Sequence, residues 1–250
     1  MIKISIITPV FNSIQYIQTC IENVIDQNCH EIEHIIVDGG SSDGTVDLIK
    51  EYASRYPHIK WISEKDKGQS DAMNKGIGIS TGEYLSFLNV DDYYEKDLFK
   101  YVMGLFNNSN EKFYVGNCNI WDEKGQLMYV SRPKDNTLFS CHFRQTYPIN
   151  PSSYFYKKSL HDELGMYQEN DHFGMDLDFF LRYMNLYKKY YYEDKVWGNF
   201  NVVDTCKTFN DNLNGNMMNR RNELFQFYWK QNNFILRYYY IVKNKIFKRY

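Results

Sequence analysis

Short apolar segments alternate with segments of helical periodicity through the first ninety residues of the chain. The apolar segments are 3–10, which is rich in β-branched residues, 32–38, 59–64 and 84–88, and the helical segments between them are 13–28, 43–56 and 70–79. This alternation is typical of βαβ units, in which a helix joins two parallel strands. Because such connections place helices on both faces of the sheet, the sequence predicts an α/β fold with a mostly parallel, covered sheet.

Polar side chains follow each of these four predicted strands at its carboxyl end. The segments concerned are TPVFN at 8–12, DGGSSDGT at 38–45, EKDKG at 64–68 and NVDD at 89–92. Open α/β sheets bind their ligands in the crevice outside the carboxyl ends of the strands. We therefore expect the four segments to meet on one rim of the sheet and to form a ligand site.

Asp91 and Asp92 stand where the apolar segment 84–88 reaches the surface. They suit a solvated turn or the cap of a following helix, since Asp is favoured in both places. They also suit a divalent cation, because Mg²⁺ and Mn²⁺ prefer oxygen ligands and leave positions for water and phosphate. A hard cation would neutralise the charge of a departing diphosphate. The motif alone leaves both interpretations open.

The segment VDGGSSDGT combines a helix start with a carboxylate that a helix start does not explain. Ser42 and Asp43 are typical capping residues. Asp38 instead ends an otherwise apolar strand, where its carboxylate could accept a hydrogen bond from the N–H of a nucleotide base. The glycines lack the G-x-G-x-x-G spacing of dinucleotide-binding folds, which argues against NAD.

The alternation weakens beyond Tyr101. Segments 112–121 and 126–131 are predicted to be antiparallel strands, 174–187 and 209–232 are predicted to be helices, and the polar segment 132–153 is predicted to be a long loop, mobile or in contact with substrate.

Composition excludes several classes of protein. The net charge of −2 argues against a dedicated nucleic-acid binder. The five cysteines and six histidines are scattered, without C-x-x-C or paired-histidine spacing, which favours reduced thiols over disulfides or a zinc site. The start of the sequence lacks the pattern of a signal peptide, and apolar runs stay well below the ~18 residues of a membrane span. We therefore expect a cytoplasmic protein.

Five segments occur in the order found in family-2 glycosyltransferases with the GT-A fold. They are SIITPVFN, HIIVDGGSSDGT, SEKDKGQSDAMNKGI, TGEYLSFLNVDD and PSSYFYKKS followed by GMDLDFFLR. The chain resembles that family over residues 2–210. The resemblance implies a GT-A domain over 1–208, with a nucleotide-sugar-binding half (1–100) and an acceptor half (101–208), followed by a C-terminal helical, basic and aromatic extension over 209–250.

The resemblance also implies roles for individual residues. Asn89-Val90-Asp91 takes the place of the Asp-x-Asp motif, with Asp91 as the ligand of Mn²⁺ or Mg²⁺. Asp176 takes the place of the catalytic base. The residues implied to bind the nucleotide sugar are Thr8, Pro9, Phe11, Asp38, Lys67, Gly68, Asp71, Asn74, Asn89 and Asp92.

The chain departs from the family pattern at three positions. Asn89 stands where a carboxylate is frequent, Met175 where a glutamate is frequent, and Val203 where members often carry a histidine, with Lys207 as another candidate phosphate contact. Asp176 also has a structural interpretation, as a first-turn carboxylate favoured by the helix dipole, which Asp178 would serve equally.

The resemblance implies an inverting glycosyltransferase that moves a sugar from a UDP or dTDP donor to a saccharide or lipid-linked saccharide, in bacterial surface-polysaccharide assembly. The alternative is a catalytically inactive nucleotide-sugar-binding or scaffold subunit, which the three departures favour. A sugar nucleotidyltransferase would need a glycine-rich, basic loop after the first strand, and TPVFN is not such a loop.

The segment 229–250 interleaves aromatic residues with basic ones and contains no acidic residue. It is either an amphipathic helix packed on the domain or an attachment to an anionic membrane surface, where each basic residue contributes ~1 kcal/mol. Such a segment would lie on the membrane rather than span it. The basic residues are Lys230, Arg237, Lys243, Lys245, Lys248 and Arg249.

Overall fold

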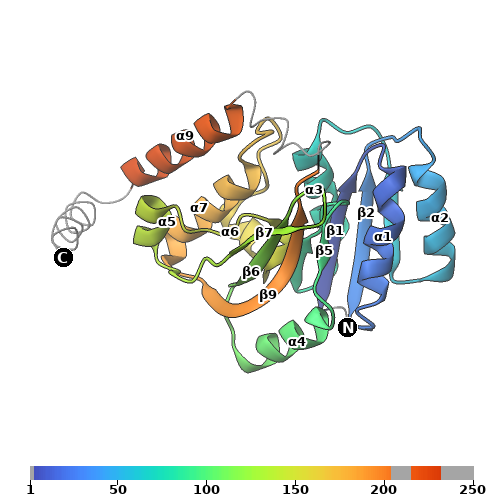
Figure 1. Ribbon diagram of the computed structural model, residues 1–250, viewed down its shortest axis with the longest axis horizontal. Helices are drawn as coiled ribbons and strands as arrows, with labels where there is room; N and C mark the ends of the chain where they lie inside the picture. Colours follow the sequence, from blue (N-terminus) through green and yellow to red (C-terminus); the bar gives the residue numbers. More distant parts are fainter. Residues whose placement is uncertain (1–2, 204–214, 232–250) are drawn as a thin grey trace.

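The computed structural model describes residues 3–203 and 215–231. Its first half is a parallel sheet with helices on both faces (Figure 1). The strands β1 (Ile4–Val10), β2 (Ile32–Asp38), β3 (Ile59–Ser63) and β4 (Tyr84–Phe87) alternate with the helices α1 (Ile14–Ile25), α2 (Thr45–Arg55) and α3 (Gln69–Ile79). These seven elements confirm the predicted alternation, with ends that differ by a few residues.

The side chains of β2 show how the two faces are built. Successive residues of a strand point to opposite faces. Ile35 packs in the cluster that contains Met73 of α3, whereas Ile36 packs with Ile17 of α1 and Ile49 of α2. The apolar run 35–37 in β2 is therefore what a sheet covered on both faces requires.

The second half extends the same sheet with mixed pairing. Strand β8 (Tyr154–Lys157) pairs antiparallel with both β4 and β6 (Phe113–Trp121), and β9 (Tyr191–Asn201) pairs parallel with β6. Strand β7 (Leu127–Ser131) is antiparallel to β6, as predicted. The described residues form a nine-stranded sheet of order β3-β2-β1-β4-β8-β6-β9-β5, with β5 at Tyr93–Tyr94 and β7 attached to β6. The helix α4 (Leu98–Asn108) follows β5.

The prediction of one long loop over 132–153 is wrong. The segment contains the helix α5 (Leu138–Arg144) and the 3₁₀ helix η1 (Pro151–Ser153). Leu138 and Cys141 of α5 are buried in the core, and the side chain of Thr137 accepts a hydrogen bond from the amide of Ser140 at 3.2 Å. Two apolar residues at helical spacing and a capping threonine thus suffice to form a short helix among polar residues.

The helices α6 (Leu160–Leu164), α7 (Met175–Tyr187) and α9 (Asn216–Gln231) complete the described chain. The prediction of a helix over 174–187 is confirmed, and that over 209–232 is confirmed for 216–231. Helix α9 packs against α7, where the hydroxyl of Tyr228 donates to Asp178 Oδ1 at 2.6 Å and Arg220 forms an ion pair with Asp171 at 2.9 Å. The segment 232–250, with most of the predicted membrane contacts, lies outside the described residues. In the part that is described, no helix is both long and apolar enough to cross a membrane.

Candidate active site

The carboxyl ends of β1, β2 and β4 lie side by side, as the sequence predicts. Val10 is in register with Asp38, and Asp38 with Ser63 of β3. The amide of Leu88 donates to the carbonyl of Ile7 at 3.0 Å, so the segment after β4 leaves the sheet beside β1. The rim of the sheet therefore carries the segment 89–92 next to the segments that follow β1 and β2.

The turn after β4 is fixed by Asp92. The amide of Asp92 donates to the carbonyl of Asn89 at 3.0 Å and closes the turn. The buried carboxylate of Asp92 accepts hydrogen bonds from Asn89 Nδ2 at 2.9 Å, Asn150 Nδ2 at 2.8 Å and the Asn201 amide at 3.1 Å. Burial, and then the charge of Asp91, raise the pKa of Asp92 above the ordinary value of a carboxyl group. Asp92 thus joins β4 to η1 and β9, in a position that is costly for a charged group.

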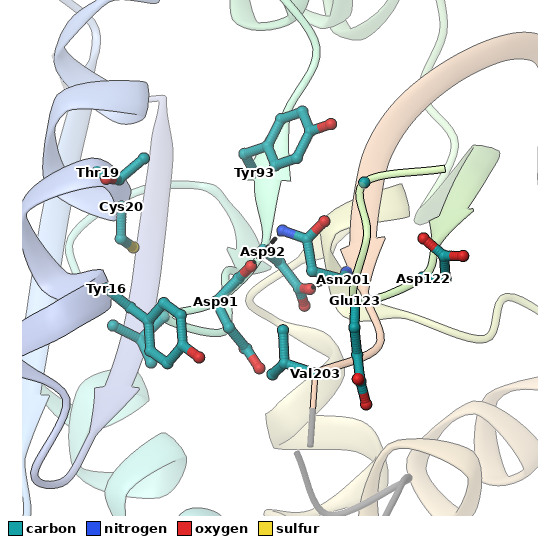
Figure 2. Close-up of a pocket in the computed structure, with 12 residues that line it drawn as sticks. Tyr16, Thr19, Cys20, Asp91, Asp92, Tyr93, Asp122, Glu123, Asn201 and Val203 are labelled. Atoms are coloured by element: carbon teal, nitrogen blue, oxygen red, sulfur yellow. Dashed lines mark hydrogen bonds between the residues drawn. The ribbon is translucent and has the colours of Figure 1, made fainter. Parts of the chain in front are cut away.

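Asp91 lies beside a cavity of about 260 Å³ between α1 and the β6–β7 turn. Figure 2 shows its carboxyl group directed between Tyr16 and Val203. Burial raises the pKa of Asp91 above the ordinary value. The residues around the cavity are Tyr16, Thr19, Cys20, Val90, Asp91, Asp92, Tyr93, Asp122, Glu123, Gly125, Asn201 and Val203.

The chemistry of this cavity fits a hard cation that is shared with a phosphate ligand. Asp91 offers carboxylate oxygens, and the lining residues include no Lys or Arg that would neutralise it. Within residues 3–203 and 215–231, no group of three or more His, Cys, Asp or Glu side chains could hold a metal ion by itself. Mg²⁺ is usually held by one or two carboxylates together with substrate phosphates, so a single well-placed carboxylate agrees with that mode.

The departure at Asn89 has a local explanation. The Asn89 side chain donates to Asp92 and accepts from Gln69 Nε2 at 3.1 Å, so both ends of its amide are used. A carboxylate at this position would repel Asp92 instead of donating to it. Asn89 therefore stabilises the turn that carries Asp91.

Asp38 and Thr8 have side chains that are engaged within the protein. The carboxylate of Asp38 accepts from the amides of Gly40 at 2.9 Å and Ser41 at 3.0 Å, from the hydroxyl of Ser63 at 2.7 Å and from that of Ser41. The Thr8 hydroxyl is buried and lies 2.9 Å from His34 Nε2. Both residues shape the rim, and their predicted contacts with a base stay predictions.

Phe11 and Pro9 lie on the rim itself. The Phe11 side chain is 61% exposed, and Pro9 is half-buried at the end of β1. A large exposed aromatic ring beside a ligand crevice suits stacking against a planar base.

The segment that leads into α3 contains the other predicted nucleotide-binding residues. Lys67 Nζ lies 2.9 Å from Glu169, and the Asp71 carboxylate accepts from the Lys67 amide at 3.0 Å. Gly68 has φ 124° and ψ 179°, a conformation that is essentially restricted to glycine. Asn74 exchanges two hydrogen bonds of 3.0 Å with the backbone of Tyr167. Asn74 thus connects α3 to the segment before α7.

Asp176 lies in the first turn of α7, close to a buried group of tyrosines. Burial first, and then the charge of Asp176, hold the pKa of Tyr154 well above the usual value. The Ser70 hydroxyl, at the start of α3, contacts Met175 Sδ at 2.7 Å. Asp176 is therefore beside the 67–70 segment, although it is not among the residues that line the cavity of Asp91.

Several residues at the cavity were not predicted from the sequence. They are Tyr16 of α1, Glu123 of the β6–β7 turn and Asn201. Asn150, which donates to Asp92 but does not line the cavity, was not predicted either. The Asp122 side chain accepts from the amides of Lys124 at 2.9 Å and Gln126 at 2.8 Å and so forms the turn that carries Glu123. The segment DEKG between two predicted strands indicated such a turn, but no sequence pattern indicated which strand edge it would face. Val203, the position at which the resemblance implies a histidine, lies beside Asp91 (Figure 2).

The family model described as glycosyl transferase family 2 matches residues 5–165, and the chain belongs to that family. It is 36% identical over 117 residues to an uncharacterized glycosyltransferase, YibD, of Escherichia coli K12, a match that covers 47% of the chain and 33% of the relative. It is 31% identical over 148 residues to an Escherichia coli chondroitin synthase, a match that covers 56% of the chain and 21% of that protein. The chain thus matches only a third or less of the length of these two relatives.

Solved structures share the fold. S. aureus TarS 1-349 matches with a TM-score of 0.72 at 18% sequence identity, and the match covers 93% of this chain and 66% of TarS 1-349. Its complex with UDP-GlcNAc matches with a TM-score of 0.68 at 19% identity, and that match covers 81% of this chain and 59% of the TarS chain. The mannosyltransferase PcManGT of Pyrobaculum calidifontis, in complex with GDP-Man and Mn²⁺, matches with a TM-score of 0.61 at 17% sequence identity. This match covers 78% of this chain and 56% of PcManGT. The predicted GT-A fold is confirmed, with mixed pairing in the second half of its sheet.

Proposed function

We propose that this family-2 glycosyltransferase transfers a sugar, with inversion, from a UDP or dTDP sugar to a hydroxyl group of a saccharide or lipid-linked saccharide. The observation that carries the proposal is Asp91, whose desolvated carboxyl group faces a cavity at the rim where the strand ends meet. A divalent cation, shared with the diphosphate of the donor, would stabilise that carboxylate in its charged form.

The donor would lie along the rim. Phe11 offers an exposed ring for the base. The 38–42 loop, whose amides at Gly40 and Ser41 donate to Asp38, would offer backbone carbonyl groups. The segment 67–71 would approach the diphosphate through Lys67. The UDP-GlcNAc complex of the structurally similar TarS supports a nucleotide-sugar donor of this kind.

Asp91 would hold Mn²⁺ or Mg²⁺ together with the diphosphate. The ion, when bound, neutralises negative charge on the leaving diphosphate. The Mn²⁺ complex of PcManGT supports such a site. Asn89, Asn150 and Asn201 would keep the turn rigid through Asp92, so that Asp91 is positioned before the donor arrives.

Asp176 would act as the general base. It would accept the proton of the acceptor hydroxyl as that oxygen bonds to the anomeric carbon, while the bond from that carbon to the diphosphate oxygen breaks on the opposite face. Proton transfer by a positioned group contributes ~10²–10⁴-fold to a rate. The helix start that carries Asp176 is anchored to α3 by the Ser70–Met175 contact.

A thermal-shift screen of nucleotide sugars with Mn²⁺, followed by a donor-hydrolysis assay, tests the proposal. We expect one uracil or thymine nucleotide sugar to raise the melting temperature in the presence of Mn²⁺ and to be slowly hydrolysed. If no nucleotide sugar stabilises the protein, the proposed function is wrong.

A second candidate is a nucleotide-sugar-binding subunit without catalytic activity. It is favoured by Val203, which supplies no metal ligand beside Asp91. The same assay separates the two, because this candidate predicts stabilisation without hydrolysis. In either case a location on the cytoplasmic face of the membrane, in polysaccharide assembly, is part of the proposal.

A further inference from the structure

A groove of about 300 Å³ lies between α5 and the second half of α9, away from the cavity of Asp91. In Figure 1 the two helices lie at the side of the molecule opposite α1 and α2. We call it the α5–α9 groove; its lining residues are His142, Gln145, Asn222, Phe225, Gln226 and Trp229.

The lining of the α5–α9 groove is polar but carries no formal charge. Asn222, Gln145 and Gln226 present amide groups, which both donate and accept hydrogen bonds. Burial, followed by the charge of Lys188, lowers the pKa of His142 to about 4, so the ring is neutral at physiological pH. None of the six lining residues is Lys, Arg, Asp or Glu, and the groove therefore suits an uncharged, hydroxyl-rich ligand better than a phosphate or a metal ion.

Aromatic rings form the floor of the groove. The His142 ring lies 5.4 Å from the Trp229 ring and 5.8 Å from that of Phe225, and Tyr147 packs on Phe225 at 5.6 Å. An aromatic surface rimmed by amides is the combination that recognises a sugar, which has apolar C–H faces and a polar hydroxyl edge.

The backbone at the end of α5 positions one of the lining residues. Gln145 has φ 51°, in the left-handed region in which helices commonly end. This conformation ends α5 at Gln145, whose amide side chain lines the groove.

The groove and the candidate base lie on two helices that pack against each other. A Cβ atom at Gly174, just before α7, would be 2.7 Å from Leu224 and 3.0 Å from Arg220, so the start of α7 faces the middle of α9. From Asn222 to Trp229 the groove extends along α9 over a rise of ~10 Å, and none of its lining residues lines the cavity of Asp91. A saccharide whose reacting hydroxyl lies between Asp176 and a donor at that cavity would therefore need further sugar units to reach the groove.

We propose that the α5–α9 groove binds an internal sugar unit of an oligosaccharide acceptor, at a distance from the reacting hydroxyl. This inference rests on the proposed function and deepens it, because it makes the acceptor a chain rather than a single sugar. Trp229 would provide the ring surface, and Asn222 and Gln226, which precede it on α9, would provide hydrogen bonds.

Binding to an array of bacterial and plant oligosaccharides, without any donor, tests the proposal. The oligosaccharide bound most tightly by the full chain is then titrated by calorimetry against Trp229→Ala, Gln226→Ala and Phe227→Ala. Phe227 is the matched control, because it is an aromatic residue of α9 that is 55% exposed and does not line the groove. We expect affinity to fall about tenfold for Trp229→Ala, which corresponds to 1.4 kcal/mol, less for Gln226→Ala, and not at all for Phe227→Ala.

Two results would overturn the inference: no oligosaccharide on the array binds the wild type, or Trp229→Ala and Gln226→Ala both bind like Phe227→Ala. Donor hydrolysis is measured on the same proteins and should be unchanged in all three variants. If the wild type does not hydrolyse any donor, the proposed transferase activity is contradicted instead. Failure of the groove proposal and failure of the proposed function are therefore distinguishable. Gln226→Ala, at an exposed position, keeps the test valid if Trp229→Ala does not fold.

Discussion

Buried carboxyl groups at the two ends of the strands differ in the direction in which their pKa is shifted. Glu33, near the amino end of β2, has a buried side chain that accepts from Lys60 at 2.5 Å, the Ser5 hydroxyl at 2.6 Å and the Thr81 amide at 2.5 Å. Burial would raise its pKa, but these donors outweigh burial and lower it. At the carboxyl ends of the strands, burial raises the pKa of both Asp91 and Asp92.

This difference distinguishes a carboxylate that stabilises the fold from carboxylates that would be used for ligand binding. At Glu33 the protein supplies a cation, so the charged form contributes to stability. At Asp91 and Asp92 it supplies amides and burial but no lining cation, and two neighbouring carboxylates persist at a cost in stability. A cost of this kind is expected where a ligand provides the missing charge. Substitutions at the two groups of carboxylates and at their neighbours test that contrast.

The largest effect is expected from Asp176→Asn. It removes the proposed general base with little change in shape, so turnover should fall at least ~10²-fold while nucleotide affinity stays nearly constant. Steady-state kinetics and calorimetry with UDP measure the two quantities. Asp178→Asn, two residues away, is not the control, because its carboxylate holds Tyr228 and Arg182. Asp162→Asn in α6 is a suitable one. Wild-type turnover in Asp176→Asn would show that the base is elsewhere.

The next effect concerns Glu33. Because its pKa is lowered in the folded state, Glu33 contributes stability above the pKa of the unfolded chain, and this contribution disappears as pH falls through the folded value. We expect Glu33→Gln to lower the free energy of unfolding by about 2 kcal/mol at pH 7 and by much less at pH 3. Urea titrations at both pH values measure it. Asp47→Asn, at a position with an 85% exposed side chain, should have no such effect. An equal loss at both pH values would contradict the charge-based account.

Asp91→Asn should act in the opposite direction on the ligand-free protein. It removes the repulsion with Asp92, so the free energy of unfolding should rise by about 1 kcal/mol, which raises the melting temperature by about 2–4 °C in a chain of this size. Nucleotide with Mn²⁺ should no longer add stability. A destabilisation comparable to that of Glu33→Gln would mean that Asp91 is a structural residue.

The smallest effect is expected from Val203→His. Val203 lies beside Asp91 at the cavity, so an imidazole at this position would add a nitrogen ligand for the cation. Affinity for Mn²⁺ in the presence of UDP should rise a few-fold, by up to about 1 kcal/mol. Val203→Leu supplies the matched control without a ligand atom. If both variants bind Mn²⁺ alike, Val203 does not face the cation.

The parallel half of the fold could be predicted from the sequence because its signals are local. Each strand is a short, mostly apolar run, and each helix between two strands has an apolar face, which is typical of parallel βαβ units. In a parallel sheet the carboxyl ends of all strands lie on one rim, although β4 pairs with β1 and not with β3, which precedes it. The rim and Asp91 follow from that topology alone.

The second half could not be predicted in the same way. Strand β9 contains charged residues in its first half and pairs with β6, about 80 positions earlier, and β5 has only two residues. The partners of Asp92 are 58 and 109 positions away, at Asn150 and Asn201. No local pattern encodes such distant pairs, and asparagine is a common turn residue. Glu123 was missed for the same reason, since its turn was predictable but its position opposite α1 was not.

Calorimetric titration of UDP into the wild type and Asp91→Ala, each with and without Mn²⁺, tests the central claim most directly. We expect Mn²⁺ to tighten UDP binding at least about tenfold in the wild type and to have no effect in the variant. Equal UDP affinity with and without Mn²⁺ in the wild type would contradict the claim that the carboxylate at the end of β4 binds a cation shared with the diphosphate.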